Sequence, residues 1–256
     1  MKVNLHTHTA RCYHAEGTDE EYVRAAIDAG YDKLGFSDHT PFPYVDGFFN
    51  GDKMEMDQLE DYFSSVESLR SKYADKLEIL LGLECEAVEE FFPFLQELRK
   101  HVDYLILGNH GDKRIEGFFG RLKKPEQLWH YLDCAVKGME TGLFLYLAHP
   151  DLMLHRYPVF DEDARQVSVA LCREAKQLNM PLEYNLYGVA KGKPAAGLGY
   201  PCREFWEIAA QEGVKAVIGV DAHAPYRLTE ADFAEANRIL TELGIETIED
   251  PTTLIK

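Results

Sequence analysis

Cysteine is scarce in this chain of 256 residues, and its spacing follows no pattern that forms disulfide frameworks or structural zinc ribbons. The cysteines are odd in number, and no Cys-x-x-Cys pair occurs. A disulfide-stapled domain would need an even set, and a zinc ribbon would need paired cysteines. We therefore expect reduced, buried thiols. The cysteines are Cys12, Cys85, Cys134, Cys172 and Cys202.

Long apolar runs and long basic runs are also missing. No apolar stretch approaches the roughly 20 residues that a membrane-spanning helix requires, and no signal-peptide pattern precedes His6. No run of Lys and Arg exceeds two residues, and the formal net charge is −17. Such a charge repels nucleic acid and anionic membranes. These absences predict a cytoplasmic protein that binds neither nucleic acid nor membrane.

Repeats, low-complexity segments and Gly/Ser linkers are absent as well. Hydrophobic residues make up 46% of the chain and charged residues 28%, which is ordinary for a globular protein. The length is sufficient for one large domain, or for two small domains with little linker between them. We predict a single domain over residues 1–256.

What the chain does contain is an alternation of short apolar runs and helical patterns. The apolar runs are continuous, as in strands buried on both faces of a parallel sheet or barrel. Strands are predicted at 2–5, 33–36, 77–83, 104–107, 143–148, 181–184 and 216–220, and helices at 18–30, 56–73, 89–101, 125–141, 161–179, 203–213 and 229–244. This order predicts an α/β fold, either a (β/α) barrel or an open doubly wound sheet. Residues 245–256 form either a terminal strand or a loop.

Side chains of the kinds that bind metals follow almost every predicted strand. His, Asp or Glu stands at six of the seven strand ends, and Asn185 stands at the other. The carboxyl ends of barrel strands meet on one face, so residues far apart in the sequence would share one pocket. A single His-x-His pattern is weak evidence, because side chains alternate along any strand. Its repetition around one sheet predicts a metal site.

The residue types at these strand ends indicate which metals would bind. Seven imidazoles and two carboxylates are more than one ion needs, so we expect two or three ions. A set rich in imidazole and without thiolate suits Zn, Fe or Mn and disfavours Ca and Mg. Glu84 and Asp221 are the natural bridging carboxylates. The candidate ligands are His6, His8, His14, His39, Glu84, His110, His149, Asp221 and His223.

The order of these motifs resembles that of the PHP (polymerase and histidinol phosphatase) family over residues 3–225. The motifs are HTHT followed by His14, then FSDH, GLE, a histidine after the fourth strand, AHP and DAH. The loop EYNLYGVAKGKPAAGLGYPCREF, followed by VIGVDAHAP, is most similar to the histidinol-phosphate phosphatase branch. The resemblance implies a distorted seven-stranded (β/α)7 TIM-like barrel, with three divalent metal ions at the carboxyl ends of the strands. It implies one ion on His6, His8, Glu84 and Asp221, a second on Glu84, His110 and His149, and a third on His14, His39 and His223.

For such a centre we predict hydrolysis of a small phosphate monoester. L-Histidinol phosphate, an intermediate of histidine biosynthesis, is the substrate that the resemblance implies. A metal-bridging hydroxide would attack phosphorus. The expected catalytic residues are Glu84, Asp221 and His223, and Asp38 and Asp151 are candidates for the acid that protonates the leaving group.

The phosphate group also needs cationic partners. Arg156 is the first candidate, because it lies seven residues after His149 and a guanidinium binds phosphate through two hydrogen bonds. Arg203 and Lys191, in the loop after the sixth strand, are weaker candidates. The loop 41–52, which begins Pro-Phe-Pro-Tyr, is expected either to cap the pocket or to pack as an ordinary loop.

Several alternatives remain open at this stage. The most serious is a phosphatase or phosphoesterase of the same family with another substrate, such as phosphotyrosine, a sugar phosphate or a nucleotide. A nuclease of the family and a non-catalytic metal-binding protein are further alternatives. An amidohydrolase is disfavoured, because that class uses a lysine after strand four where this chain has His110. The oligomeric state is left open.

Overall fold

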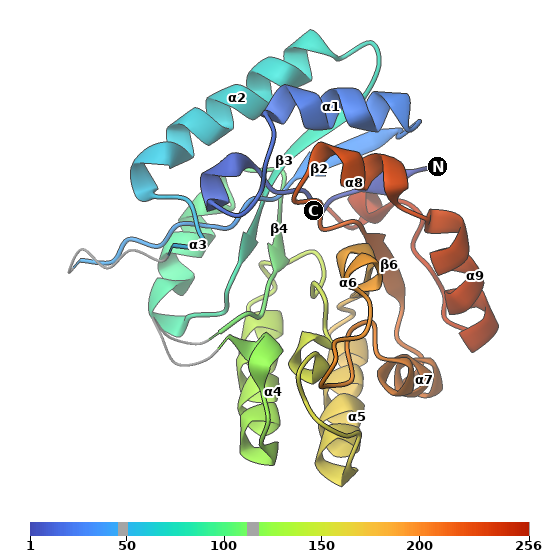
Figure 1. Cartoon of the computed structure of the whole chain (residues 1–256). Helices are drawn as coiled ribbons and strands as arrows, with labels where there is room; N and C mark the ends of the chain where they lie inside the picture. The colour runs from blue at the N-terminus through green and yellow to red at the C-terminus, as the bar shows by residue number, and fades with distance from the viewer. Residues whose placement is uncertain (46–50, 112–117, 256) are drawn as a thin grey trace.

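The computed structural model describes residues 1–45, 51–111 and 118–255. Its first four strands pair in parallel in the order β1-β2-β3-β4 and form a curled half-barrel (Figure 1). Two further strands, β5 and β6, pair in parallel as a second sheet. The strands are β1 (Val3–Asn4), β2 (Lys33–Phe36), β3 (Glu78–Cys85), β4 (Tyr104–Leu107), β5 (Leu182–Asn185) and β6 (Ala216–Gly219).

One predicted strand, 143–148, is not a regular strand. Leu147 forms single bridges to Leu107 of β4 and to Leu182 of β5. The backbone N–H of Leu145 donates to Leu105 O at 2.8 Å, whereas that of Leu147 donates to Pro181 O at 3.0 Å. The segment is hydrogen-bonded on both sides, as an internal strand would be, but its pairing with each neighbour is a single bridge and not a ladder.

A second single bridge joins the two ends of the strand series. Thr7, just after β1, pairs with Ala222, just after β6. The N–H of His8 donates to Ala222 O at 2.9 Å, and the N–H of Ala222 donates to His6 O at 3.1 Å. The segments that carry the first and last candidate ligands are therefore held side by side by their backbones.

Helices surround the strands on the outside (Figure 1). The predicted capping box is present at Thr18, whose side chain accepts from Glu21 N while the Glu21 carboxylate accepts from Thr18 N. The helices are α1 (Asp19–Asp28), α2 (Leu59–Lys72), α3 (Phe92–Leu98), α4 (Pro125–Glu140), α5 (Glu162–Gln177), α6 (Leu186–Lys191), α7 (Arg203–Glu212), α8 (Pro225–Glu230) and α9 (Phe233–Leu243). Along the described part of the chain, none has the length and apolar character needed to cross a bilayer.

The last predicted helix, 229–244, is wrong as a single element. The chain turns at Ala231, and Asp232 caps a new helix by accepting a hydrogen bond from Glu235 N at 2.9 Å. This capping interaction competes with continuation of the preceding helix. After α9, Thr247 bridges to Ala216 and a 3-10 turn follows at Pro251–Leu254, so the chain end combines a single bridge with an irregular turn.

The buried apolar side chains form an outer cluster under the helices and a smaller inner core between the strands. Side chains alternate along a strand, so Leu80 and Glu84 of β3 share a face. Leu80 belongs to the inner core, and Glu84 continues the same row at the carboxyl end of the strand. The inner core consists of Val3, Leu5, Leu80, Tyr104, Ile106, Tyr146, Ala148 and Val217. It forms the apolar floor beneath the polar cluster described next.

Candidate metal centre

The nine candidate ligands gather at the carboxyl ends of the strands, as the sequence predicts. Glu84 lies at the middle of one group. Its Oε2 is 3.5 Å from the Nε2 atoms of both His6 and His8, and 3.1 Å from His39 Nδ1. Its Oε1 is 2.9 Å from His149 Nε2 and 3.6 Å from His110 Nε2. One buried carboxylate thus faces five imidazoles.

Asp221 is the centre of a second group. Its Oδ1 lies 3.1 Å from His8 Nε2, 3.6 Å from His6 Nε2 and 3.2 Å from His223 Nδ1. His223 Nε2 in turn lies 3.0 Å from His14 Nε2. His6 and His8 therefore contact both carboxylates, and His14 completes the outer end of the cluster.

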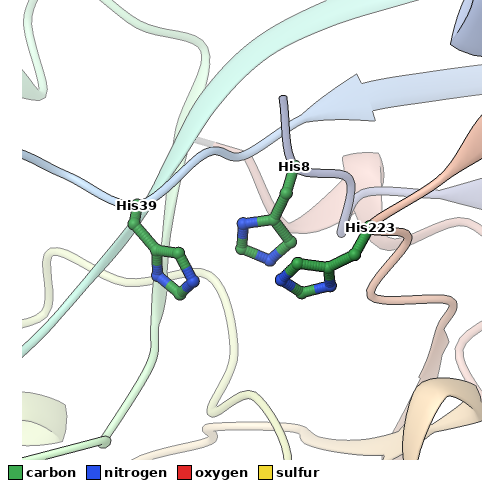
Figure 2. A group of neighbouring side chains, drawn as sticks. All are labelled: His8, His39 and His223. Carbon is green, nitrogen blue, oxygen red and sulfur yellow. The ribbon is translucent and has the colours of Figure 1, made fainter. Parts of the chain in front are cut away.

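His8 occupies a central position between the groups. Figure 2 shows the rings of His8, His39 and His223 directed into one space, although they come from three distant segments. The ring centroid of His8 lies 4.3 Å from that of His39 and 4.1 Å from that of His223. The candidate ligand atoms of these three residues lie within 4.8 Å of one another, as do those of His6, His8 and Glu84.

Unpartnered buried atoms indicate that this cluster is built for cations. Buried polar atoms are almost always hydrogen-bonded. Here several buried nitrogen and oxygen atoms have no such partner among the described residues, and they point at one another. They include His6 Nε2, His8 Nε2, Glu84 Oε2 and Asp221 Oδ1. Imidazole and carboxylate donors of this kind fit divalent transition metals, so the residues present are suited to hold such ions.

Carboxylates behind the histidines fix the direction of the rings. Glu183 Oε1 lies 2.7 Å from His6 Nδ1 and Glu86 Oε1 lies 3.0 Å from His110 Nδ1, so each ring can donate from Nδ1 and keep Nε2 as a donor atom for metal. Asp38 Oδ1 lies 3.5 Å from His8 Nδ1 on the same side. The sequence analysis missed Glu183 and Glu86. The signal for Glu183 was its place in a strand, two residues before Asn185.

The backbone is strained at two candidate ligands. His149 and Asp221 have φ values of 30° and 53°, a left-handed conformation that costs free energy in residues other than glycine. Both residues lie where the chain leaves the strands and turns into the site. Carboxylates approach the backbone so closely at two positions that only glycine fits there. A Cβ at Gly108 would overlap the carboxylate of Glu84, and a Cβ at Gly219 would overlap the carboxylate of Glu183.

The charges of the cluster lower the pKa of the carboxylate Glu84 and raise the pKa of the imidazole His6. Burial alone would raise the pKa of Glu84, but His110, His6 and His39 outweigh it and hold that pKa well below its usual value. Burial would lower the pKa of His6, but Glu183, Asp221 and Glu84 raise it well above its usual value. The protein without metal thus favours ionised carboxylates beside protonated imidazole.

A cavity of about 500 Å³ opens onto this cluster. Phe42 and Tyr44, from the described part of the loop 41–52, line it, whereas residues 46–50 lie outside the described residues. Cations that the sequence analysis did not select, Lys53 and Arg121, also line it. The remaining lining residues are His14, His39, Asp52, Glu86, Val88, His110, Gly111, Phe118, His149, Leu152, Tyr187, Tyr200, Asp221 and His223.

The three cations selected from the sequence do not line the cavity. Arg156 is exposed. Arg203 is exposed on α7 and forms an ion pair with Glu207 at 2.8 Å. Lys191 lies 4.8 Å from the ring centre of Tyr187, which lines the cavity, but Lys191 does not line it. The binding of phosphate by these three cations stays a prediction.

The two candidate acids also lie behind the cavity wall. Asp38 is fully buried, and it accepts from the Thr9 hydroxyl and from His39 N at 2.8 Å. Asp151 is buried, and its Oδ2 accepts from Cys202 N. Burial raises the pKa of Asp151 to about 7. Neither residue lines the cavity, whereas Asp221 and His223 do. Asp38 and Asp151 are placed to hold loops and ligands in position.

Comparisons with known proteins agree with this geometry. The model of the PHP domain family matches residues 4–187. A Deinococcus radiodurans protein named "Probable histidinol-phosphatase" is 30% identical over 262 residues, covering 95% of this chain and 94% of its own. The histidinol-phosphatase of Bacillus subtilis is 25% identical over 257 residues, covering 87% of this chain and 94% of its own.

The fold is similar to that of a solved enzyme. The histidinol phosphate phosphatase of Lactococcus lactis, crystallised with zinc, L-histidinol and phosphate, matches with a TM-score of 0.72 at 18% identity. The match covers 96% of this chain and 95% of that one. The family match spans most of the chain, and the Deinococcus relative is similar over nearly its whole length. The chain therefore belongs to the PHP domain family.

Proposed function

We propose that this protein is a metal-dependent phosphomonoesterase, and that its substrate is L-histidinol phosphate, which it hydrolyses to L-histidinol and phosphate. The observation that carries the proposal is the convergence of seven imidazoles and two carboxylates in one cluster, with buried donor atoms left unpartnered. Five of the imidazoles and Asp221 line one cavity. The names of the Deinococcus and Bacillus relatives and the ligands of the Lactococcus structure support the choice of substrate.

The proposed centre holds three divalent ions, which are Zn, Fe or Mn. The first binds His6, His8, Glu84 and Asp221, the second binds Glu84, His110 and His149, and the third binds His14, His39 and His223. Ions bound there would supply Lewis acidity toward the phosphoryl oxygens and would lower the pKa of a water molecule.

The protein's own residues orient and enclose this centre. Glu183 and Glu86 hold the Nδ1 sides of His6 and His110, so that the opposite nitrogens face the cavity. Tyr187 and Tyr200 line the wall, with ring centres 5.0 Å from that of His223 and 6.4 Å from that of His149, so their rings form the side of the cavity next to these ligands. Asp221 and His223 border the cavity, so as ligands they would hold ions directly beside the substrate. Burial would raise the pKa of Asp221, but His6 and His223 hold it well below its usual value, so this carboxylate is ionised and acts as a ligand.

The single bridges support a finer description of the fold. The segment around Leu147 links β4 to β5, and Thr7 links to Ala222. We infer a distorted seven-stranded barrel in which residues 143–148 act as the irregular fifth strand. Its carboxyl face would carry every residue of the proposed centre, as in other barrels of this kind.

The phosphatase activity is tested by phosphate release from the purified, metal-replete protein. We expect release from small phosphate monoesters, its loss on chelation and its recovery when metal is returned. The variant Asp221→Asn should lose most activity, whereas Asp250→Asn, at the far end of the chain, should keep it. Phosphate release that survives complete chelation would contradict the proposal.

A further inference from the structure

Lys53 forms a buried ion pair in the cavity wall with Glu86, the carboxylate that orients His110, and Lys53 itself has no part in the proposed function. Lys53 and Glu86 are 8% and 5% exposed, and Lys53 Nζ donates to Glu86 Oε1. Lysine is almost never buried unless it is paired. Both residues nevertheless line the cavity that opens onto the histidine cluster. A buried lysine at the edge of a ligand-sized cavity is a candidate for binding a ligand.

The pair lies beside two candidate metal ligands. Glu86 Oε1 also accepts from His110 Nδ1 at 3.0 Å, so the ammonium and the imidazole share one carboxylate oxygen. The rings of His110 and His39 are 5.1 Å apart. Lys53 Nζ also lies 6.0 Å from the ring centre of Phe42. The positive charge of Lys53 is therefore fixed next to the cluster, on the side where His39 and His110 meet.

We propose that Lys53 binds the phosphoryl group of the substrate, and that Glu86 holds its ammonium in position. The inference rests on the proposed function only in taking a phosphate ester as the ligand. A compact ammonium on a flexible stem is a common phosphate partner, and its attraction to an anion is stronger in a partly desolvated site than on the surface.

The charge balance of the wall explains why both members of the pair are needed. Without Lys53, the Glu86 carboxylate would face an incoming phosphate dianion and repel it. Glu86 Oε2 is buried and has no hydrogen-bond partner within the described residues, so nothing else on that oxygen neutralises it. Arg121, the other cation lining the described cavity, is exposed, and water weakens its attraction to an anion.

The test is calorimetric titration of inorganic phosphate into the metal-replete protein, with metal content measured for each variant. Lys53→Met should weaken phosphate binding by about 10- to 100-fold without changing metal content. Lys53→Arg should keep most of the affinity. The matched control, Lys215→Met, removes an exposed lysine that pairs with Glu246, and it should bind within about twofold of wild type.

A double variant keeps the test valid if Lys53→Met folds poorly. Lys53→Met/Glu86→Gln removes both charges and leaves no buried ion unpaired. It should bind phosphate more tightly than Lys53→Met alone and more weakly than Glu86→Gln alone. If the double variant and Glu86→Gln bound phosphate with equal affinity, a direct contact between Lys53 and phosphate would be contradicted.

Other results also overturn the inference. Wild-type affinity in Lys53→Met would do so, as would a wild-type protein that binds no phosphate. A parallel loss of metal from Lys53→Met would show that Lys53 acts on the ligands instead of on phosphate. If phosphate binding depends on Lys53 but no phosphate ester is hydrolysed, the inference stands and the proposed function fails.

Discussion

His6 Nδ1 lies 2.7 Å from Oε1 of Glu183, and both side chains are fully buried. The other oxygen of Glu183 accepts from His149 N at 3.1 Å and from Asn185 Nδ2 at 2.8 Å. One carboxylate of β5 thus sets the ring direction of His6 and the strained backbone of His149. Two candidate ligands depend on a residue that does not itself line the cavity.

Glu183→Gln is expected to weaken the centre without removing any ligand. The glutamine amide is uncharged, and it cannot accept from both His6 Nδ1 and His149 N as the two carboxylate oxygens do. Metal affinity or activity should therefore fall by about 10- to 100-fold. Metal content after dialysis against a weak chelator, together with kcat, measures this effect. Glu246→Gln, on the exposed side of an ion pair with Lys215, is the matched control. Unchanged metal retention in Glu183→Gln would refute the positioning role.

Gly108→Ala is expected to lower activity by displacing the carboxylate of Glu84. A Cβ at this position would overlap the Glu84 carboxylate, which cannot move without leaving the imidazoles that surround it. Activity should fall at least tenfold, in the range seen when a supporting residue of a metal site is lost. Gly51→Ala, which meets no atom within 4 Å, should behave as wild type. A fully active Gly108→Ala protein would show that the carboxylate tolerates displacement.

His14→Ala tests how the ligands are divided among the ions. His14 reaches the cluster only at its outer end, where it lies 3.0 Å from His223. The variant should lose about one metal ion per chain, while the ions near Glu84 remain. Elemental analysis of protein purified in the presence of metal gives the count. Loss of all metal, or of none, would contradict the proposed division.

Metal removal is expected to destabilise the fold. Ions that bind the native state and not the unfolded chain add stability, so stripping them should lower the Tm by about 5–10 °C. Returning the metal should restore the Tm. The variant His6→Ala/His8→Ala should show a smaller chelator effect, because fewer ligands remain. A Tm that is indifferent to chelator in the wild type would argue against a tightly bound centre.

The convergence of the candidate ligands could be predicted because it depends on topology. Parallel strands place their carboxyl ends together, so a histidine or carboxylate after each strand reaches one face. His6, Glu84 and Asp221 illustrate this, since they lie close together from three different strands. Their division among three ions, and the single domain over residues 1–256, stay predictions.

The supporting residues could not be predicted because they depend on packing. Lys53 and Glu86 carry no motif, and their pairing joins residues 33 positions apart in the sequence. The buried positions of Asp38 and Asp151 likewise follow from contacts with Thr9 and Cys202, which no spacing rule reveals. The segment 143–148 has the composition of a strand, but it pairs with each of its two neighbours through a single bridge, which its sequence does not reveal.

The most direct measurement is kcat/KM of the metal-replete protein for L-histidinol phosphate, compared with that for a generic aryl phosphate such as p-nitrophenyl phosphate. A cavity lined by Phe42, Tyr44 and other aromatic side chains suits a small cationic alcohol. We predict a preference for L-histidinol phosphate of at least about 100-fold, or roughly 3 kcal/mol of transition-state discrimination. Equal values for the two esters would contradict the assignment of histidinol phosphate as the substrate.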